Sequence, residues 1–176
     1  MSVTLSADQF SALLSAKTMP KKRVKSLLTD FNDAPNIEDL INGDNFIPPD
    51  IMSLGCVELP RYYGDCIIKN IEQFQTKEIP IHCSDYKRKK FYYRTNNTWC
   101  KDDKFVQKFM TKIYRYTMTT LCERLKNHST YCETQAMIST FNDNERFPHA
   151  KLKEKILTYI AKPLSSSEYS ITSDEE

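Results

Sequence analysis

Cysteine and histidine are the residues of this chain that could hold a metal ion. His128 and Cys132 are four residues apart near the expected start of a helix, and Cys122 precedes His128 by six residues. Thiolate and imidazole are zinc ligands, but a structural zinc site needs four of them. The local sequence offers no fourth ligand, although His149 or Cys100 could approach in space. Buried thiols and a surface histidine explain these residues more simply, so we expect no metal and no cofactor, with zinc as the alternative.

A second group has the residue types of a thiol nucleophile and its base, namely His82, Cys83 and Asp85. They fall in an expected β-strand, where adjacent side chains point to opposite faces, so His82 and Cys83 cannot readily share a hydrogen bond. Asp102 and Asp103 precede an expected helix, and helix capping explains them better than acid/base catalysis. The three glycines lack the spacing of a phosphate-binding loop. We therefore expect a protein without enzyme activity.

The six cysteines are even in number but include no close C-x-x-C pair. The first residues lack the layout of a secretory signal, and no apolar run is long enough to cross a bilayer. We therefore expect an intracellular protein that does not enter a membrane, with reduced cysteines that are mostly buried as small hydrophobic side chains.

Charge is strongly segregated along the sequence, although the formal net charge is only +2. Between residues 27 and 60 there are seven acidic residues and no lysine or arginine, whereas residues 86–126 carry twelve basic residues against three acidic ones. The basic segment is also rich in aromatic residues. Lysine and arginine neutralise phosphates, and exposed aromatic rings can stack on unpaired bases.

This basic aromatic segment is the candidate site, and DNA or RNA is its first candidate partner. Four of its charges are consecutive, at the expected turn of a β-hairpin where side chains project into solvent. The candidate nucleic-acid-binding residues are Lys87, Arg88, Lys89, Lys90, Tyr92, Arg94, Lys112 and Arg115. The alternative interpretation is a solvated face of amphipathic elements, or a basic surface that complements the acidic segment within the fold.

The hydrophobic patterns predict a mainly α fold with a small antiparallel β-hairpin or sheet, that is, an α+β fold. Apolar periodicity and capping residues predict the following helices: one from residue 6, then 20–31, 36–43, 60–75, 102–126, one from residue 130, and 148–163. Short runs rich in β-branched and aromatic residues predict strands at 79–83 and 90–94, with Asn96 and Asn97 forming a turn.

The composition divides the chain into four segments, although we expect a chain of 176 residues to form a single hydrophobic core. Residues 1–45 are an N-terminal helical segment, and residues 46–59, which contain Pro48 and Pro49, are a linker. Residues 60–163 are an α+β domain with the central hairpin and the long helix. Residues 164–176 are polar and acidic, and we expect a disordered tail.

Two short motifs support a resemblance. Pro80-Ile81-His82-Cys83-Ser84-Asp85, followed by a basic turn, an aromatic strand and Trp99-Cys100-Lys101-Asp102, resembles a segment of uncharacterised proteins of nucleocytoplasmic large DNA viruses. The resemblance covers roughly residues 60–126. It implies a viral protein that acts within an infected cell or a virion, and it favours a binding role over an enzymatic one.

These observations predict a non-enzymatic viral accessory or virion-associated protein that binds through its hairpin and long helix, with nucleic acid as the first candidate partner. The alternative is a structural or adaptor protein whose helices pack against another viral protein. Salt dependence separates the two, because phosphate binding weakens steeply as salt rises whereas an apolar helix interface does not.

Overall fold

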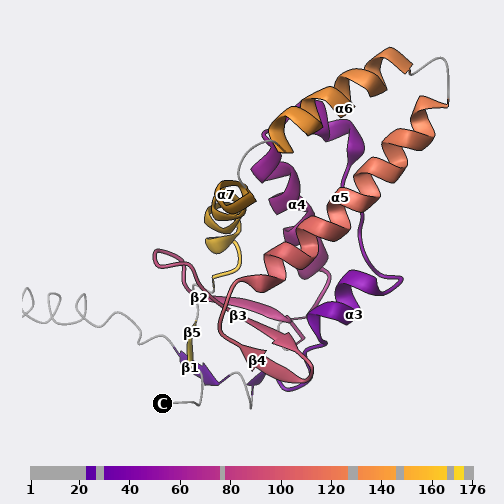
Figure 1. Cartoon of the computed structure of the whole chain (residues 1–176). Coiled ribbons are helices and arrows are strands. Elements are labelled where there is room, and N and C mark those ends of the chain that lie inside the picture. Colours follow the sequence, from indigo (N-terminus) through magenta and orange to yellow (C-terminus); the bar gives the residue numbers. More distant parts are fainter. Residues whose placement is uncertain are drawn as a thin grey trace, which may run out of the picture.

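The computed structural model describes residues 23–26, 30–75, 78–126, 131–145, 149–165 and 169–172. Helices dominate the fold, and a small antiparallel sheet lies at one end of them, which confirms the predicted α+β class (Figure 1). The elements are β1 (Arg23–Ser26), α3 (Ile37–Asn42), the 3-10 helix η1 (Ile51–Gly55), α4 (Leu59–Glu72), β2 (Ile81–Asp85), β3 (Lys90–Thr95), β4 (Thr98–Cys100), α5 (Lys104–Leu125), α6 (Tyr131–Glu145), α7 (His149–Ala161) and β5 (Tyr169–Thr172).

The predicted hairpin is part of a three-stranded antiparallel sheet with the order β2-β3-β4. Ile81 pairs with Tyr93, and His82 pairs with Tyr92. Asn96 and Asn97 form the β3–β4 turn, as predicted, with φ angles of 49° and 58°. Asparagine tolerates this left-handed conformation better than most residues, and two-residue hairpin turns require it.

The two faces of the sheet have different partners, as the two-residue period of a strand requires. One face carries Ile81, Cys83, Phe91 and Tyr93 into the main hydrophobic core, which the helices complete. On the other face, Tyr92 packs with Phe31 and Trp99 in a small separate cluster.

The helices pack around a core whose largest fully buried side chains include Tyr63, Phe109 and Phe141. Helix α7 packs along α4, and α5 contacts both of them. Helix α5 begins at Lys104 with Asp103 at its N-cap position, but Asp103 makes no capping hydrogen bond through its side chain. The carboxylate of Asp102, one residue earlier, accepts a hydrogen bond from the Lys104 backbone nitrogen at 2.8 Å. Of the two predicted capping carboxylates, only Asp102 therefore bonds to the start of the helix. None of the helices among the described residues is long and apolar enough to cross a membrane.

The core is continuous across the segment predicted as a linker at residues 46–59. Ile51 and Leu54 of η1 are buried in the same cluster as the apolar residues of α3 and α4. The side chain of Asn70 on α4 also holds this segment, because it accepts a hydrogen bond from the Ile47 backbone nitrogen at 2.8 Å and donates one to the Ile47 carbonyl oxygen at 2.7 Å. The predicted segments 1–45 and 60–163 therefore share one core where the structure describes them.

Two predictions of local structure were wrong. The predicted helix over 20–31 is replaced at residues 23–26 by strand β1, and the predicted disordered tail contains strand β5. The two strands pair in parallel, with Arg23 opposite Tyr169 and Ser26 opposite Thr172. The pairing of these two distant segments provides the backbone hydrogen bonds that a helix would otherwise form locally. The apolar spacing typical of a helix in residues 20–31 is therefore outweighed by a contact with a distant part of the chain. The helix predicted from residue 6 lies outside the described residues.

Candidate nucleic-acid interface

The β2–β3 turn carries most of the predicted binding residues and has a defined backbone. The carboxylate of Asp85 accepts hydrogen bonds from the backbone nitrogens of Lys87 and Arg88 at 3.0 and 3.1 Å. The strand register shifts between Cys83 and Asp85, so the turn leaves the regular ladder there. The side chains of Lys87 and Arg88 are exposed.

Lys89 fastens this turn to helix α7. Its Nζ atom lies 3.4 Å from Oε1 of Glu154 and 3.2 Å from Oγ1 of Thr158. Its backbone has a φ of 53°, which helps to turn the chain back into β3. Figure 1 shows the turn projecting from the sheet beside α7. The neighbouring Lys90 opens β3 with an exposed side chain.

A groove with two lobes borders the same face of α7. Both lobes lie between residues 55–61 and α7, and they share Cys56, Val57, Glu58, Pro60, Lys151 and Lys155. The lobes have volumes of about 490 and 970 Å³. Glu154 and Thr158, the partners of Lys89, line the wider lobe. The groove and the hairpin turn therefore adjoin, and we call the two together the turn–groove surface.

The turn–groove surface is mainly basic. Counting the turn, the groove lining and the ion-pair partners of both, the surface has seven cations: Arg61, Lys87, Arg88, Lys89, Lys90, Lys151 and Lys155. It has four anions: Glu58, Asp65, Asp85 and Glu154. Among the ion pairs on this surface are those of Arg61 with Asp65, Arg88 with Asp85, and Lys89 with Glu154. The Arg61 and Arg88 side chains are exposed and their ion pairs are weak, so both cations can still contact an anionic ligand.

Arg94 and Tyr92, two predicted site residues, are occupied within the fold. Arg94 donates through Nη1 to the carbonyl oxygen of Ala34 at 2.6 Å and also to that of Asn32. Tyr92 is only 5% exposed and packs against Phe31. Tyr92 is therefore buried, and Arg94 is half-buried with its guanidinium bonded to backbone carbonyls.

Lys112 and Arg115 lie apart from the hairpin turn. They are on α5 and line a shallow cavity of about 330 Å³ with Glu38 and Ile41 of α3. The Lys112 Nζ atom lies 5.3 Å from the centroid of the Phe46 ring. The structure thus divides the predicted site into the cations of the turn and a separate pair on α5.

Sequence reasoning missed the contribution of α7. Lys151, Lys155 and Tyr159 recur every four residues, and all three line the groove. The buried residues Leu152, Ile156 and Ile160 follow the same spacing one position later. This pattern could have indicated a cationic face on that helix. At the turn, the exposed aromatic residue is Tyr86, with 49% of its surface accessible, rather than Tyr92.

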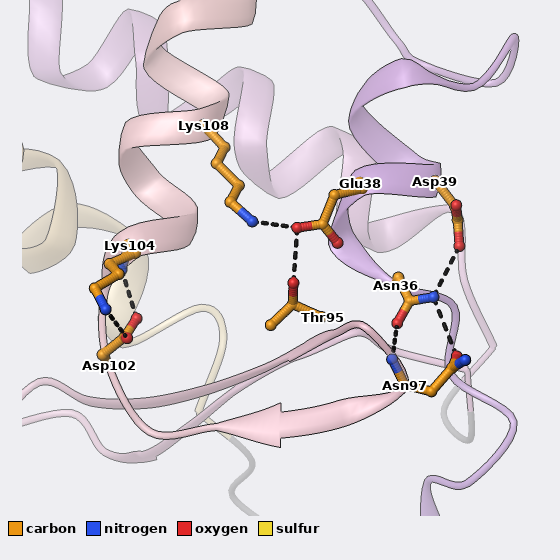
Figure 2. Close-up of polar contacts among 8 residues, drawn as sticks. All are labelled: Asn36, Glu38, Asp39, Thr95, Asn97, Asp102, Lys104 and Lys108. Carbon is orange, nitrogen blue, oxygen red and sulfur yellow. Dashed lines mark hydrogen bonds and ion pairs between the residues drawn. The ribbon is translucent and has the colours of Figure 1, made fainter.

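A polar network connects α3 to the sheet and to α5 (Figure 2). Glu38 accepts a hydrogen bond from Thr95 Oγ1 at 2.7 Å and pairs with Lys108. Burial acts to raise the pKa of Glu38, but the hydrogen bonds from Lys108 and Thr95 outweigh it and hold the pKa below the usual 4.5. Asn36 and Asn97 exchange two hydrogen bonds, of 3.1 and 2.6 Å. This network positions the sheet, and its Glu38 and Lys108 also line the cavity that contains Lys112 and Arg115.

Cys83 and His82 are not arranged as a thiol nucleophile and its base. Cys83 is buried, and burial raises its pKa to about 11, so its thiolate is scarce at neutral pH. His82 lies on the opposite face of the strand, with its ring 4.1 Å from that of Phe31. The prediction that most cysteines are buried was wrong, because only Cys66 and Cys83 are buried, whereas the others are exposed or half-buried.

The alternative zinc site is only partly within the described residues. Cys122 and Cys132 are exposed, on α5 and α6, while His128 lies outside the described residues. Among the residues that the structure describes, no group of three or more histidine, cysteine or acidic side chains is arranged to hold a metal ion.

No protein-family model, curated protein or solved structure matched this chain.

Proposed function

We propose that this chain is a non-enzymatic nucleic-acid-binding protein that contacts phosphates through the turn–groove surface. The observation that carries the proposal is the contact of Lys89 with Glu154 and Thr158. This contact sets the cations of the turn beside those of α7. Charges that lie far apart in the sequence then act on one ligand, and each neutralised phosphate releases a counterion.

The side chains at the turn suit a ligand with repeated negative charges. Lys87, Arg88 and Lys90 are exposed, and the Asp85 hydrogen bonds fix the backbone that carries the first two. A fixed backbone loses less conformational freedom on binding than a flexible one. Tyr86, whose surface is 49% exposed, directly precedes these cations in the chain.

The resemblance to proteins of nucleocytoplasmic large DNA viruses suggests where this binding would take place. On that resemblance, the chain is a viral accessory or virion-associated protein, and it meets nucleic acid inside an infected cell or a virion. A structural or adaptor protein is the second candidate. Tyr114 and Tyr116 on α5 and Tyr131 on α6 are each more than a third exposed, and they offer aromatic surface to a protein partner.

The test measures affinity for single-stranded and duplex DNA and RNA against salt concentration, starting at about 50 mM where phosphate contacts are strong. A variant carrying Lys87→Gln, Arg88→Gln and Lys90→Gln should flatten the slope of log affinity against log salt by about 2 to 3, because up to three phosphate contacts are lost. Lys89 is left intact because it fastens the turn to α7.

The matched control is Lys112→Gln with Arg115→Gln, which removes basic residues from the separate α5 site. Its slope should stay close to that of the wild-type protein. Equal slopes for the wild-type protein and the turn variant, or no binding at low salt, would favour the adaptor role.

A further inference from the structure

The groove beside α7 contains an aromatic ring held in one position. A Cβ atom added to Gly64 would lie 2.3 Å from Cδ1 of Tyr159 and 2.9 Å from Cε1, so the ring rests directly on the glycine. The Tyr159 hydroxyl donates a hydrogen bond to Oδ1 of Asp65 at 2.6 Å. The ring is packed on one side and tethered at its end, yet it remains 36% exposed and lines the wider lobe.

The surroundings of this ring combine apolar and charged groups, and the three cations Arg61, Lys151 and Lys155 outnumber the two anions Glu58 and Glu154. Val57 and Pro60 come from the segment before α4, and Lys151 and Lys155 come from α7. Both lobes lie in the range of about 300 to 1,000 Å³ that is usual for small-molecule sites, large enough for one nucleotide. A fixed ring beside two lysines matches the two parts of a nucleotide, a flat base and an anionic phosphate.

We propose that the groove holds an unpaired nucleobase stacked on Tyr159, while Lys151 and Lys155 contact the adjoining phosphates. The inference rests on the proposed function and deepens it, since it makes a single strand the preferred ligand. In a duplex the bases are paired and stacked on one another, so a base would first have to leave the helix at an energetic cost. The phosphate contacts of the hairpin turn do not require an unpaired base.

The experiment varies the ligand first, which leaves the protein intact. Fluorescence anisotropy at fixed salt compares a labelled 12-nucleotide thymidine strand, an abasic strand with the same number of phosphates, and a 12-base-pair duplex. The thymidine strand should bind at least about fivefold more tightly than the abasic strand, because stacking of one base contributes a factor of this size or more. Equal affinity for these two strands would overturn the inference.

Protein variants then locate the stacking site. Tyr159→Leu should abolish the preference for thymidine over the abasic strand, whereas Tyr159→Phe should keep it because the ring remains. Tyr116→Leu, at a tyrosine on α5 that is also about a third exposed, is the matched control and should keep the preference. A preference that survives in folded Tyr159→Leu protein would overturn the inference.

The outcomes also separate this inference from the proposed function. If the abasic and thymidine strands bind equally, with a steep salt slope that the turn variant flattens, the groove inference fails and the proposed function stands. If no strand binds, both fail. If an acidic peptide occupies the groove and displaces no bound strand, the inference also fails, and the groove is a peptide site.

Discussion

Arg94 of strand β3 donates a hydrogen bond to the carbonyl oxygen of Ala34, sixty residues earlier in the chain, at 2.6 Å. The same nitrogen also donates to the carbonyl oxygen of Asn32. The guanidinium therefore fastens the segment before α3 to the sheet. Its cationic character suggested a phosphate contact, but its geometry is that of a structural residue.

Arg94→Ala should lower the free energy of unfolding by about 1.5 to 3 kcal/mol, the usual contribution of hydrogen bonds made by a charged group. Urea denaturation measures this loss. The salt slope of nucleic-acid binding should not change, because the Arg94 guanidinium is already bonded to the carbonyl oxygens of Asn32 and Ala34. Arg115→Ala, at an exposed position on α5, is the control and should change stability by less than about 0.5 kcal/mol. A flatter slope with unchanged stability would place Arg94 in the interface instead.

Gly64 and Gly55 give a matched pair of substitutions. Gly64→Ala would place a methyl group 2.3 Å from the Tyr159 ring, whereas a methyl group at Gly55 would have nothing within 4 Å. We expect Gly64→Ala to cost about 1 to 3 kcal/mol through overpacking between α4 and α7. Gly55→Ala should change the free energy of unfolding by less than about 0.5 kcal/mol. Thermal denaturation of both variants checks this, and equal midpoints would mean that Tyr159 moves aside freely.

Local signals were enough to predict most of the central fold. Apolar periodicity predicted α4, α5 and α7, and the change to a two-residue period predicted the hairpin. The β1–β5 pair was missed because parallel pairing between distant segments has no local signal. Tyr169, Ile171 and Thr172 do have high strand propensity, and that sign was present in the segment predicted as disordered.

The candidate site was predicted less completely than the fold. Consecutive charges at a turn are visible in the sequence, so Lys87, Arg88 and Lys90 were found, and the structure exposes them. The sequence does not show which individual side chains are buried, so Tyr92 was included in the predicted site although it is buried. Lys155 was missed because its proximity to the turn depends on how α7 packs on α4.

Acid should destabilise the protein partly through Glu38. Its pKa is lowered in the folded state, so its contribution to stability is complete above the unfolded pKa and is lost as pH falls through the folded pKa. Unfolding midpoints should therefore fall below about pH 4.5. Glu38→Gln should lower stability at pH 7 and weaken this pH dependence. Asp44→Asn, at an exposed carboxylate, is the control, and equal pH profiles for wild type and Glu38→Gln would contradict the prediction.

Thiol reactivity should divide the six cysteines according to their burial. Cys56, Cys122 and Cys132 are exposed and should react quickly with a chromogenic disulfide reagent at pH 8. Cys66 and Cys83 should react only after unfolding, because burial raises their pKa to about 12 and about 11 and thiolate is the reactive form. Cys56→Ser should remove one equivalent from the fast phase, and Cys66→Ser should remove none. A fast phase of five or six equivalents would mean that the core around α4 and the sheet opens readily.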